Sequence, residues 1–131
     1  RIIELTSLTQ VGIRSLSKDE AGKVYKNLKT FFMKDIIDND NWISEAINSL
    51  PGDKVYVTID MDGFDPSIMP SVGTPEPGGM EWYGTLALLK RLSLEKKVIG
   101  FDAVELSPIT GNISPDFLTA KLIYKFLSYI F

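Results

Sequence analysis

Two kinds of apolar pattern alternate along this chain. Short runs rich in valine and isoleucine are typical of buried strands, and they lie at residues 11–13, 54–59 and 98–105. In the longer stretches, apolar residues recur every three or four positions, which predicts helices at 18–38, 42–50, 81–92 and 114–131. This alternation predicts an α/β fold with three α-β-α layers, in which helices cover both faces of a mostly parallel sheet.

Two of the predicted helices have recognisable starts. Ser17 precedes two acids, Asp19 and Glu20, which suit the positive end of a helix dipole. Ser114 is a suitable N-cap, with Pro115 in the first turn. In this last helix, the residues expected to face inward are Phe117, Leu118, Ile123, Phe126, Leu127 and Ile130.

Acidic residues follow the predicted strands. Asp60 and Asp62 come at the end of the run at 54–59, and Glu105 ends the run at 98–105. Because residues at i and i+2 of a strand share a face, Asp60 and Asp62 can present two carboxylates to one point, where a cation would relieve their repulsion. Hard oxygen ligands suit Mn²⁺ or Mg²⁺. Ligands of open α/β sheets bind at the carboxyl ends of strands, so we expect a divalent-metal site there.

A long loop rich in proline and glycine follows the two aspartates. Asp65-Pro66 makes a rigid corner, and the segment GTPEPGG occupies 73–79. A stiff loop beside paired acids is more typical of a site wall than of a simple connection. Asp65 is interpreted as a turn-forming residue, and Asp102 as a hydrogen-bonding partner at a strand end.

The composition narrows the possible functions. The chain has 131 residues, a net charge of −3, no cysteine and no histidine. An acidic balance argues against nucleic-acid binding, and no apolar run has the length of a membrane span. A cytoplasmic location fits the lack of cysteine. Because histidine is absent, any metal here must use carboxylates and carbonyls or obtain histidine from elsewhere.

Four segments carry a resemblance to a known family. TIDMD at 58–62, with Pro66 and Gly79 beyond it, resembles the third signature of the ureohydrolases, which include arginases, agmatinases and formimidoylglutamases. GTPEPGG at 73–79 resembles agmatinases more than arginases. FDAVELSP at 101–108 resembles the last strand of the family, and VGIRS at 11–15 an earlier one. The likeness extends over essentially the whole chain in the right order.

The resemblance implies a binuclear manganese hydrolase. By position, Asp60 would bridge the two metals and Asp62 would bind one of them. Glu105 would pair with the substrate guanidinium, and Thr74 would support it from the flanking loop. A metal-bridging hydroxide would release urea and an amine, with agmatine as the expected substrate and polyamine biosynthesis as the setting. The family commonly forms trimers or hexamers.

The chain also departs from the family pattern. Two earlier motifs, Gly-Gly-Asp-His and Asp-Ala-His-x-Asp, supply most of the family's metal ligands and do not occur here. We therefore interpret residues 1–131 as a single partial domain, the carboxyl-terminal half of a ureohydrolase with an incomplete arginase-like fold. The missing amino-terminal half would be its partner. The chain alone is expected to be inactive and to bind Mn²⁺ weakly.

Two alternatives remain open on the sequence. The run at 57–63 also resembles the nucleophile loop of haloacid-dehalogenase-like phosphatases, which use Mg²⁺ and in which the first aspartate attacks phosphorus. Those enzymes prefer Thr or Val where this chain has Phe64, and they lack the downstream GTPEPGG loop. The other alternative is a degenerate half that serves in binding or assembly, which the missing histidine motifs would favour.

Overall fold

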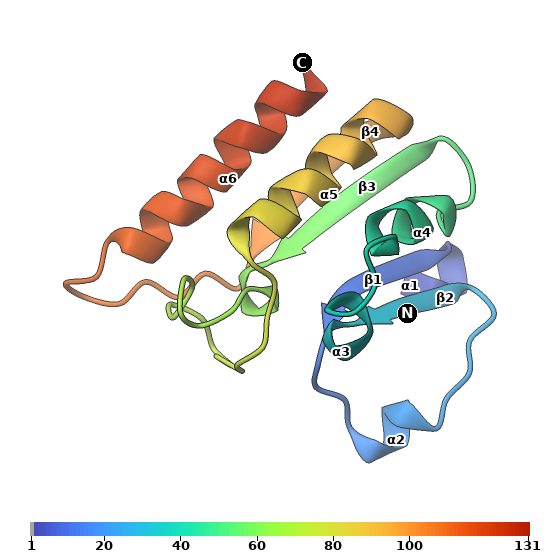
Figure 1. Ribbon diagram of the computed structural model, residues 1–131, viewed down its shortest axis with the longest axis horizontal. Coiled ribbons are helices and arrows are strands. Elements are labelled where there is room, and N and C mark those ends of the chain that lie inside the picture. The colour runs from blue at the N-terminus through green and yellow to red at the C-terminus, as the bar shows by residue number, and fades with distance from the viewer. Residues whose placement is uncertain (1) are drawn as a thin grey trace. The chain divides into compact units, whose positions relative to one another are not determined.

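The computed structural model describes residues 2–131, which form two compact units that divide after Gly52 (Figure 1). Each unit contains a two-stranded parallel sheet with its own helices. The strands and helices alternate along the chain, which confirms the parallel α/β class. Whether the two units act as the single partial domain expected above stays a prediction.

In the first unit, β1 (Leu8–Ile13) pairs with β2 (Leu28–Phe32). The strand expected at 11–13 is therefore confirmed and is longer than predicted. The helices of this unit are short: α1 (Ile2–Leu5), α2 (Lys18–Ala21), α3 (Met33–Ile36) and α4 (Trp42–Asn48). The helix expected at 42–50 is confirmed as α4.

The single helix predicted over 18–38 is wrong. Its start is confirmed, because the Ser17 hydroxyl accepts from the Glu20 amide in a capping box, but the helix ends within one turn at Gly22. The chain then forms β2, in which Phe31 is buried, whereas Val24 is 96% exposed. The apolar residues of 18–38 therefore have helical spacing by coincidence. Residues 28–32 contain threonine and phenylalanine, which suit a strand, and pairing with β1 decided their structure.

In the second unit, β3 (Lys54–Asp60) pairs in parallel with β4 (Lys97–Val104). They are joined through the 3₁₀ turn η1 (Met61–Gly63), a long loop and α5 (Trp82–Glu95), and α6 (Ser114–Ile130) follows β4. The predictions for both strands and both helices are confirmed to within three residues at each end. Glu105 lies just beyond β4 rather than inside it.

The core of the second unit lies between its sheet and its two long helices. Figure 1 shows α5 and α6 side by side over β3 and β4. The core cluster joins the strand and turn residues Ile59, Met61 and Phe64 to helix residues that include Leu122 and Phe126. On the other side of the sheet, Tyr56 and Ile99 are each 61% exposed. Within residues 53–131, helices therefore cover one face of this sheet, as an incomplete three-layer fold would have it.

The inward face predicted for α6 needs two corrections. Phe126 is fully buried, and Leu118, Ile123 and Ile130 are partly buried, as predicted. Phe117 is 69% exposed and Leu127 is also exposed, because the buried stripe of the helix runs through Pro115, Thr119, Leu122 and Phe126. Ser114 is the first residue of α6 and not its N-cap, which is Ile113. Among the helices of residues 2–131, none combines the length and apolar character that crossing a membrane requires.

Candidate metal and substrate site

Asp60 and Asp62 lie where β3 turns away from the sheet. Asp60 is the last residue of the strand, and Asp62 lies in η1, so strand alternation does not set the direction of the second carboxylate. A hydrogen bond does this instead: the backbone amide of Asp62 donates to Asp60 Oδ1 at 2.9 Å. Met61, between them, is completely buried in the core and anchors the turn. The two acids are thus held on a fixed turn at the carboxyl end of the strand.

Thr74 orients the second carboxylate from the far side of the loop. Its hydroxyl donates to Asp62 Oδ2 at 2.9 Å, and its backbone amide donates to Asp62 Oδ1 at 3.2 Å. Both oxygens of Asp62 therefore accept from one residue. These two hydrogen bonds restrict the orientation of the carboxylate. Thr74, which the sequence linked only to substrate, thus contacts a predicted metal ligand.

Asp65 closes the loop that brings Thr74 back to the aspartates. Its Oδ1 accepts from the Ser67 amide at 3.0 Å, and its Oδ2 accepts from the amides of Gly78 and Gly79 at 2.8 Å and 3.2 Å. Hydrogen bonding by Ser67, then by the Gly78 and Gly79 amides, lowers the pKa of Asp65 from 3.8 to about 2. The predicted role of Asp65 as a turn-forming residue is confirmed.

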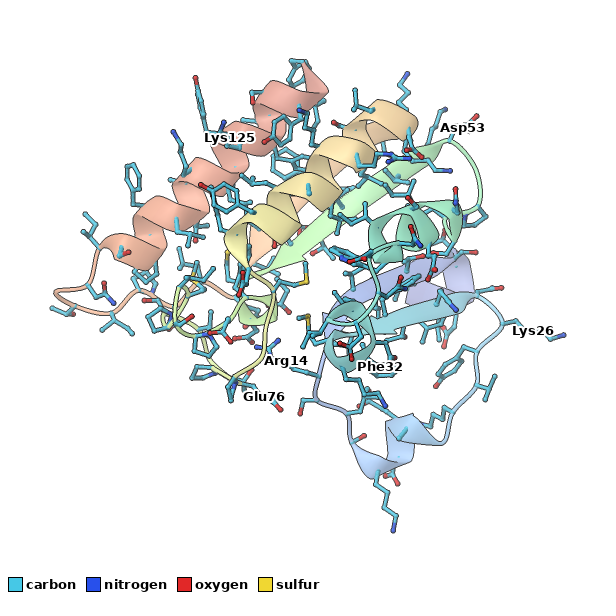
Figure 2. The ribbon with its side chains drawn as sticks, in the orientation of Figure 1. Arg14, Lys26, Phe32, Asp53, Glu76 and Lys125 are labelled. Carbon is cyan, nitrogen blue, oxygen red and sulfur yellow. The ribbon has the colours of Figure 1, made fainter. Side chains whose placement is uncertain are left out.

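Gly79 is required for the same closure. A β-carbon at this position would lie 2.4 Å from the carbonyl carbon of Phe64 and 2.5 Å from the amide nitrogen of Asp65. The two ends of the loop approach this closely because Phe64 and Met80 form an isolated parallel bridge, with Asp65 N donating to Met80 O at 3.0 Å. The loop expected as a stiff site wall (Glu76 is labelled on it in Figure 2) is thus pinned at its base.

Glu105 begins the segment after β4 in an unusual backbone conformation. Its φ is +66°, and among residues 2–131 it is the one non-glycine residue with positive φ. Val104, the residue before it, pairs with Asp60 in the sheet, so Glu105 lies one residue beyond the strand partner of the first aspartate. Just beyond, the Ser107 amide donates to the Ser71 carbonyl at 2.8 Å and ties this segment to the loop. Strained backbone of this kind is concentrated at functional sites.

The donor set fits part of a metal site. Carboxylate oxygens at Asp60 and Asp62 have the chemistry that Mn²⁺ or Mg²⁺ prefers. Within the described residues, however, no three His, Cys, Asp or Glu side chains gather closely enough to hold a metal ion. Asp60 and Asp62 alone would supply only a fraction of the ligands that such a metal ion takes.

The comparisons with known proteins agree with this geometry. Residues 1–128 match the family model described as the arginase family. This chain belongs to the arginase family. It is 48% identical to the N(1)-aminopropylagmatine ureohydrolase of Synechocystis over 98% of its length. The agmatine ureohydrolase of Thermoplasma volcanium superposes on 94% of the chain with a TM-score of 0.82 and 36% identity. The arginase of Bacillus caldovelox does so on 94% with a TM-score of 0.79 and 26% identity.

The chain spans less than half the length of these relatives. It covers 43% of the Synechocystis protein and 42% of each of the two solved structures. The expected family and the incomplete arginase-like fold are thereby confirmed. The family match extends over nearly the whole chain, so the phosphatase alternative is not favoured.

Sequence reasoning missed three features of the site. The left-handed conformation of Glu105 has no signal in a residue type that usually avoids it. The double contact of Thr74 with Asp62 depends on loop closure across twelve residues. Asp102 was expected to form hydrogen bonds, but its partners, Tyr56 and Thr58, could be found only once the strand register was known.

Proposed function

We propose that the intact protein containing this chain is a manganese-dependent hydrolase that releases urea from a guanidino compound. The observation that carries this proposal is the arrangement of Asp60 and the Thr74-held Asp62 one strand away from a backbone-strained Glu105, in a chain of the arginase family. Carboxylates at a strand end suit a cation, and a separate carboxylate suits a guanidinium group.

Asp60 and Asp62 are proposed to hold the metal ions. The Asp62 amide and Thr74 fix the direction of the two carboxylates before any metal arrives, which lowers the cost of ordering them. A bound metal pair would lower the pKa of a water molecule toward neutrality and so supply the nucleophile. The remaining ligands, including any histidine, are proposed to come from the amino-terminal part of the protein.

Glu105 is proposed to recognise the substrate. A carboxylate can accept two parallel N–H bonds from the planar guanidinium group, which orients its carbon toward the metal-binding aspartates. The left-handed backbone at Glu105 turns the chain at the end of β4 and sends the next residues to the loop at Ser71. Thr74, in the same loop, is proposed to support both Asp62 and the bound substrate.

The substrate is proposed to be agmatine or an agmatine carrying an aminopropyl group. Relatives named for each of these compounds match the chain at 36% and 48% identity. Both compounds present the same guanidinium group to Glu105, so the residues of this chain do not separate them. Discrimination would fall to contacts with the amine end of the substrate.

The test is urea release by the purified intact protein with Mn²⁺. Agmatine, N(1)-aminopropylagmatine and arginine should be compared at equal concentrations, with an aryl phosphate and Mg²⁺ as the test of phosphatase activity. We expect urea from one of the two agmatines, lost after chelation and restored by Mn²⁺. Absence of urea from all three compounds would contradict the proposal, and phosphate release would favour the phosphatase.

The chain of 131 residues should be tested alone as well. With two carboxylates in place of a full ligand set, we expect it to release no urea and to bind Mn²⁺ weakly by titration calorimetry. Urea release from the purified chain would contradict this expectation. Sizing chromatography of the intact protein would test the proposed trimer or hexamer.

A further inference from the structure

A carboxylate on β4 joins the two strands of the second unit immediately before the site. Asp102 accepts a hydrogen bond from the Tyr56 hydroxyl at 2.9 Å on Oδ2, and one from the Thr58 hydroxyl at 2.5 Å on Oδ1. Both donors lie on β3, and Thr58 is the direct strand partner of Asp102. The proposed function has assigned no role to this bridge.

The bridge follows a shift in strand register. Val55 pairs with Val98, but the next residue, Tyr56, pairs with Gly100, so Ile99 has no partner on β3. From there the pairing is regular up to Asp60 and Val104. An extra residue of this kind bends a strand and changes which residues meet beyond it. The shift thus decides which residue of β4 lies beside Asp60.

A register without the shift would place Glu105 differently. If the register of Val55 and Val98 continued, Thr58 would face Phe101, and Asp60 would face Ala103. Glu105 would then lie one residue, or about 3.3 Å, farther along the sheet from Asp60. Such a slip also reverses the face to which each side chain points. The position of Glu105 therefore depends on what selects the shifted register.

Apolar packing holds β4 both before the shift, at Val98, and just after it, at Phe101, but holds the end of the strand less well. Val98 and Phe101 pack against the core, and the Phe101 ring meets the ring of Phe126 with centroids 4.9 Å apart. Toward the site, Ala103 offers only a methyl group, and Val104 is exposed. The hydrogen bonds of Asp102 act on this final stretch, where apolar contacts contribute least.

The sequence makes room for the bridge. A β-carbon on Gly100 would lie 3.0 Å and 3.2 Å from two carbons of the Tyr56 ring, so a glycine lets the ring lie across β4 toward Asp102. The hydrogen bond to Asp102 raises the pKa of the Tyr56 hydroxyl, which keeps that group protonated as a donor. Glycine, tyrosine and aspartate thus work together at the shifted positions.

We propose that Asp102 is a positioning residue that holds the end of β4 in its shifted register and thereby places Glu105 beside Asp60 for guanidinium recognition. This inference rests on the proposed function for the role of Glu105, whereas the register itself does not. Asp102 acts through the backbone of β4, because its side chain binds Tyr56 and Thr58 on the neighbouring strand.

The experiment compares three variants of the intact, Mn²⁺-loaded protein. Asp102→Ala removes the bridge, Tyr56→Phe removes one of its two bonds, and Asp53→Asn is the matched control. Asp53 lies at the opposite end of the same sheet (Figure 2), where its backbone carbonyl accepts from Lys97 N and an asparagine would keep that bond. The readouts are KM and kcat for urea release, Mn²⁺ content, and hydrogen–deuterium exchange of the amides at 101–105.

For Asp102→Ala we expect KM for the guanidino substrate to rise about tenfold to a hundredfold, because a displacement of about 1 Å at a site can have an effect of this size. Mn²⁺ content should stay at the wild-type level, and the amides at 101–105 should exchange faster. Tyr56→Phe should give a smaller change in the same direction, with no further effect when combined with Asp102→Ala. Asp53→Asn should match the wild type.

Each contrary result has a definite meaning. An unchanged KM in Asp102→Ala, or a loss of Mn²⁺ in proportion to activity, would overturn the positioning role. If the wild-type protein releases no urea, the proposed function fails, and exchange at 101–105 then tests the register alone. Unchanged exchange in Asp102→Ala would overturn the register claim as well. If Asp102→Ala does not fold, Tyr56→Phe decides by the same readouts.

Discussion

The backbone of Glu105 gives a prediction whose sign is unusual. At most positions a glycine destabilises a protein relative to alanine by about 0.5–1 kcal/mol, because it loses more chain entropy on folding. At Glu105, φ is +66°, where a residue with a β-carbon has an energetic cost of about 1–2 kcal/mol. Relief of this strain exceeds the entropy term. Glu105→Gly should therefore be more stable than Glu105→Ala, by about 0.5–1 kcal/mol.

The comparison of these two variants separates the effect of backbone strain from the effect of losing the carboxylate. Both remove the carboxylate, so both should abolish urea release by the intact protein if Glu105 binds the guanidinium group. The metal-free protein should be used for stability, so that differences in Mn²⁺ binding do not enter. In a protein of this size, such a difference corresponds to a thermal midpoint about 1–4 °C higher for Glu105→Gly than for Glu105→Ala.

Two results would refute the reasoning. Equal midpoints, or a lower midpoint for Glu105→Gly, would mean that the left-handed conformation carries no strain in the protein. Full urea release by both variants would mean that the strain serves something other than guanidinium recognition. Glu105→Asn offers a further check, since asparagine tolerates this conformation and should fall between the other two in stability.

Three further predictions concern the loop around Asp62. Gly79→Ala should lower the free energy of unfolding by about 1–3 kcal/mol, because its β-carbon would overlap the backbone of Phe64. Denaturation by guanidinium chloride measures this loss, with Gly73→Ala as the control, since a β-carbon at Gly73 would meet open space. A loss as small as that of the control would contradict the prediction. The pKa of Asp65 is lowered from 3.8 to about 2, so its contribution to stability is present above pH 4 and is lost as the pH falls toward 2. The thermal midpoint of the wild type relative to Asp65→Asn should therefore fall over this range, and a constant difference would contradict the role of Asp65. Thr74→Val should weaken Mn²⁺ binding by the intact protein by about 10–100-fold, whereas Thr74→Ser should keep the wild-type affinity. If calorimetry gives Thr74→Val the same Mn²⁺ affinity as the wild type, the hydrogen bond from the Thr74 hydroxyl to Asp62 is dispensable.

The second unit was largely predictable from the sequence. Its strands are dense in β-branched residues, and its helices keep apolar spacing over three turns or more, so local pattern and tertiary packing agree. The acids at the strand ends followed from this, because parallel strands bring their carboxyl ends to one edge. The lengths of the elements, rather than any single residue, made the prediction secure.

The first unit shows where sequence patterns are insufficient. Residues 18–38 carry apolar side chains at helical spacing, yet they form two single helical turns and a strand. A four-residue helix gains little from its capping box, since nucleation is unfavourable and few backbone bonds follow. Pairing of β2 with β1 decided the outcome, and that interaction is not visible in a local window. Long-range pairing likewise hid the partners of Asp102.

The orientation of Asp62 depends on nearby residues of the same unit, unlike the structure of β2. Three hydrogen bonds that orient the site are local: one joins Asp62 to Asp60 in the turn, and two come to Asp62 from Thr74 of the loop, which Asp65 and Gly79 close. Their direction is thus set by residues of this chain. The remainder of a ligand set would then add affinity for Mn²⁺ without having to reorient Asp62. It follows that Thr74→Val should reduce Mn²⁺ affinity by a similar factor in the isolated chain and in the intact protein, although the two start from very different affinities. A loss confined to the intact protein would mean that the amino-terminal half, and not the loop, determines how Asp62 meets the metal.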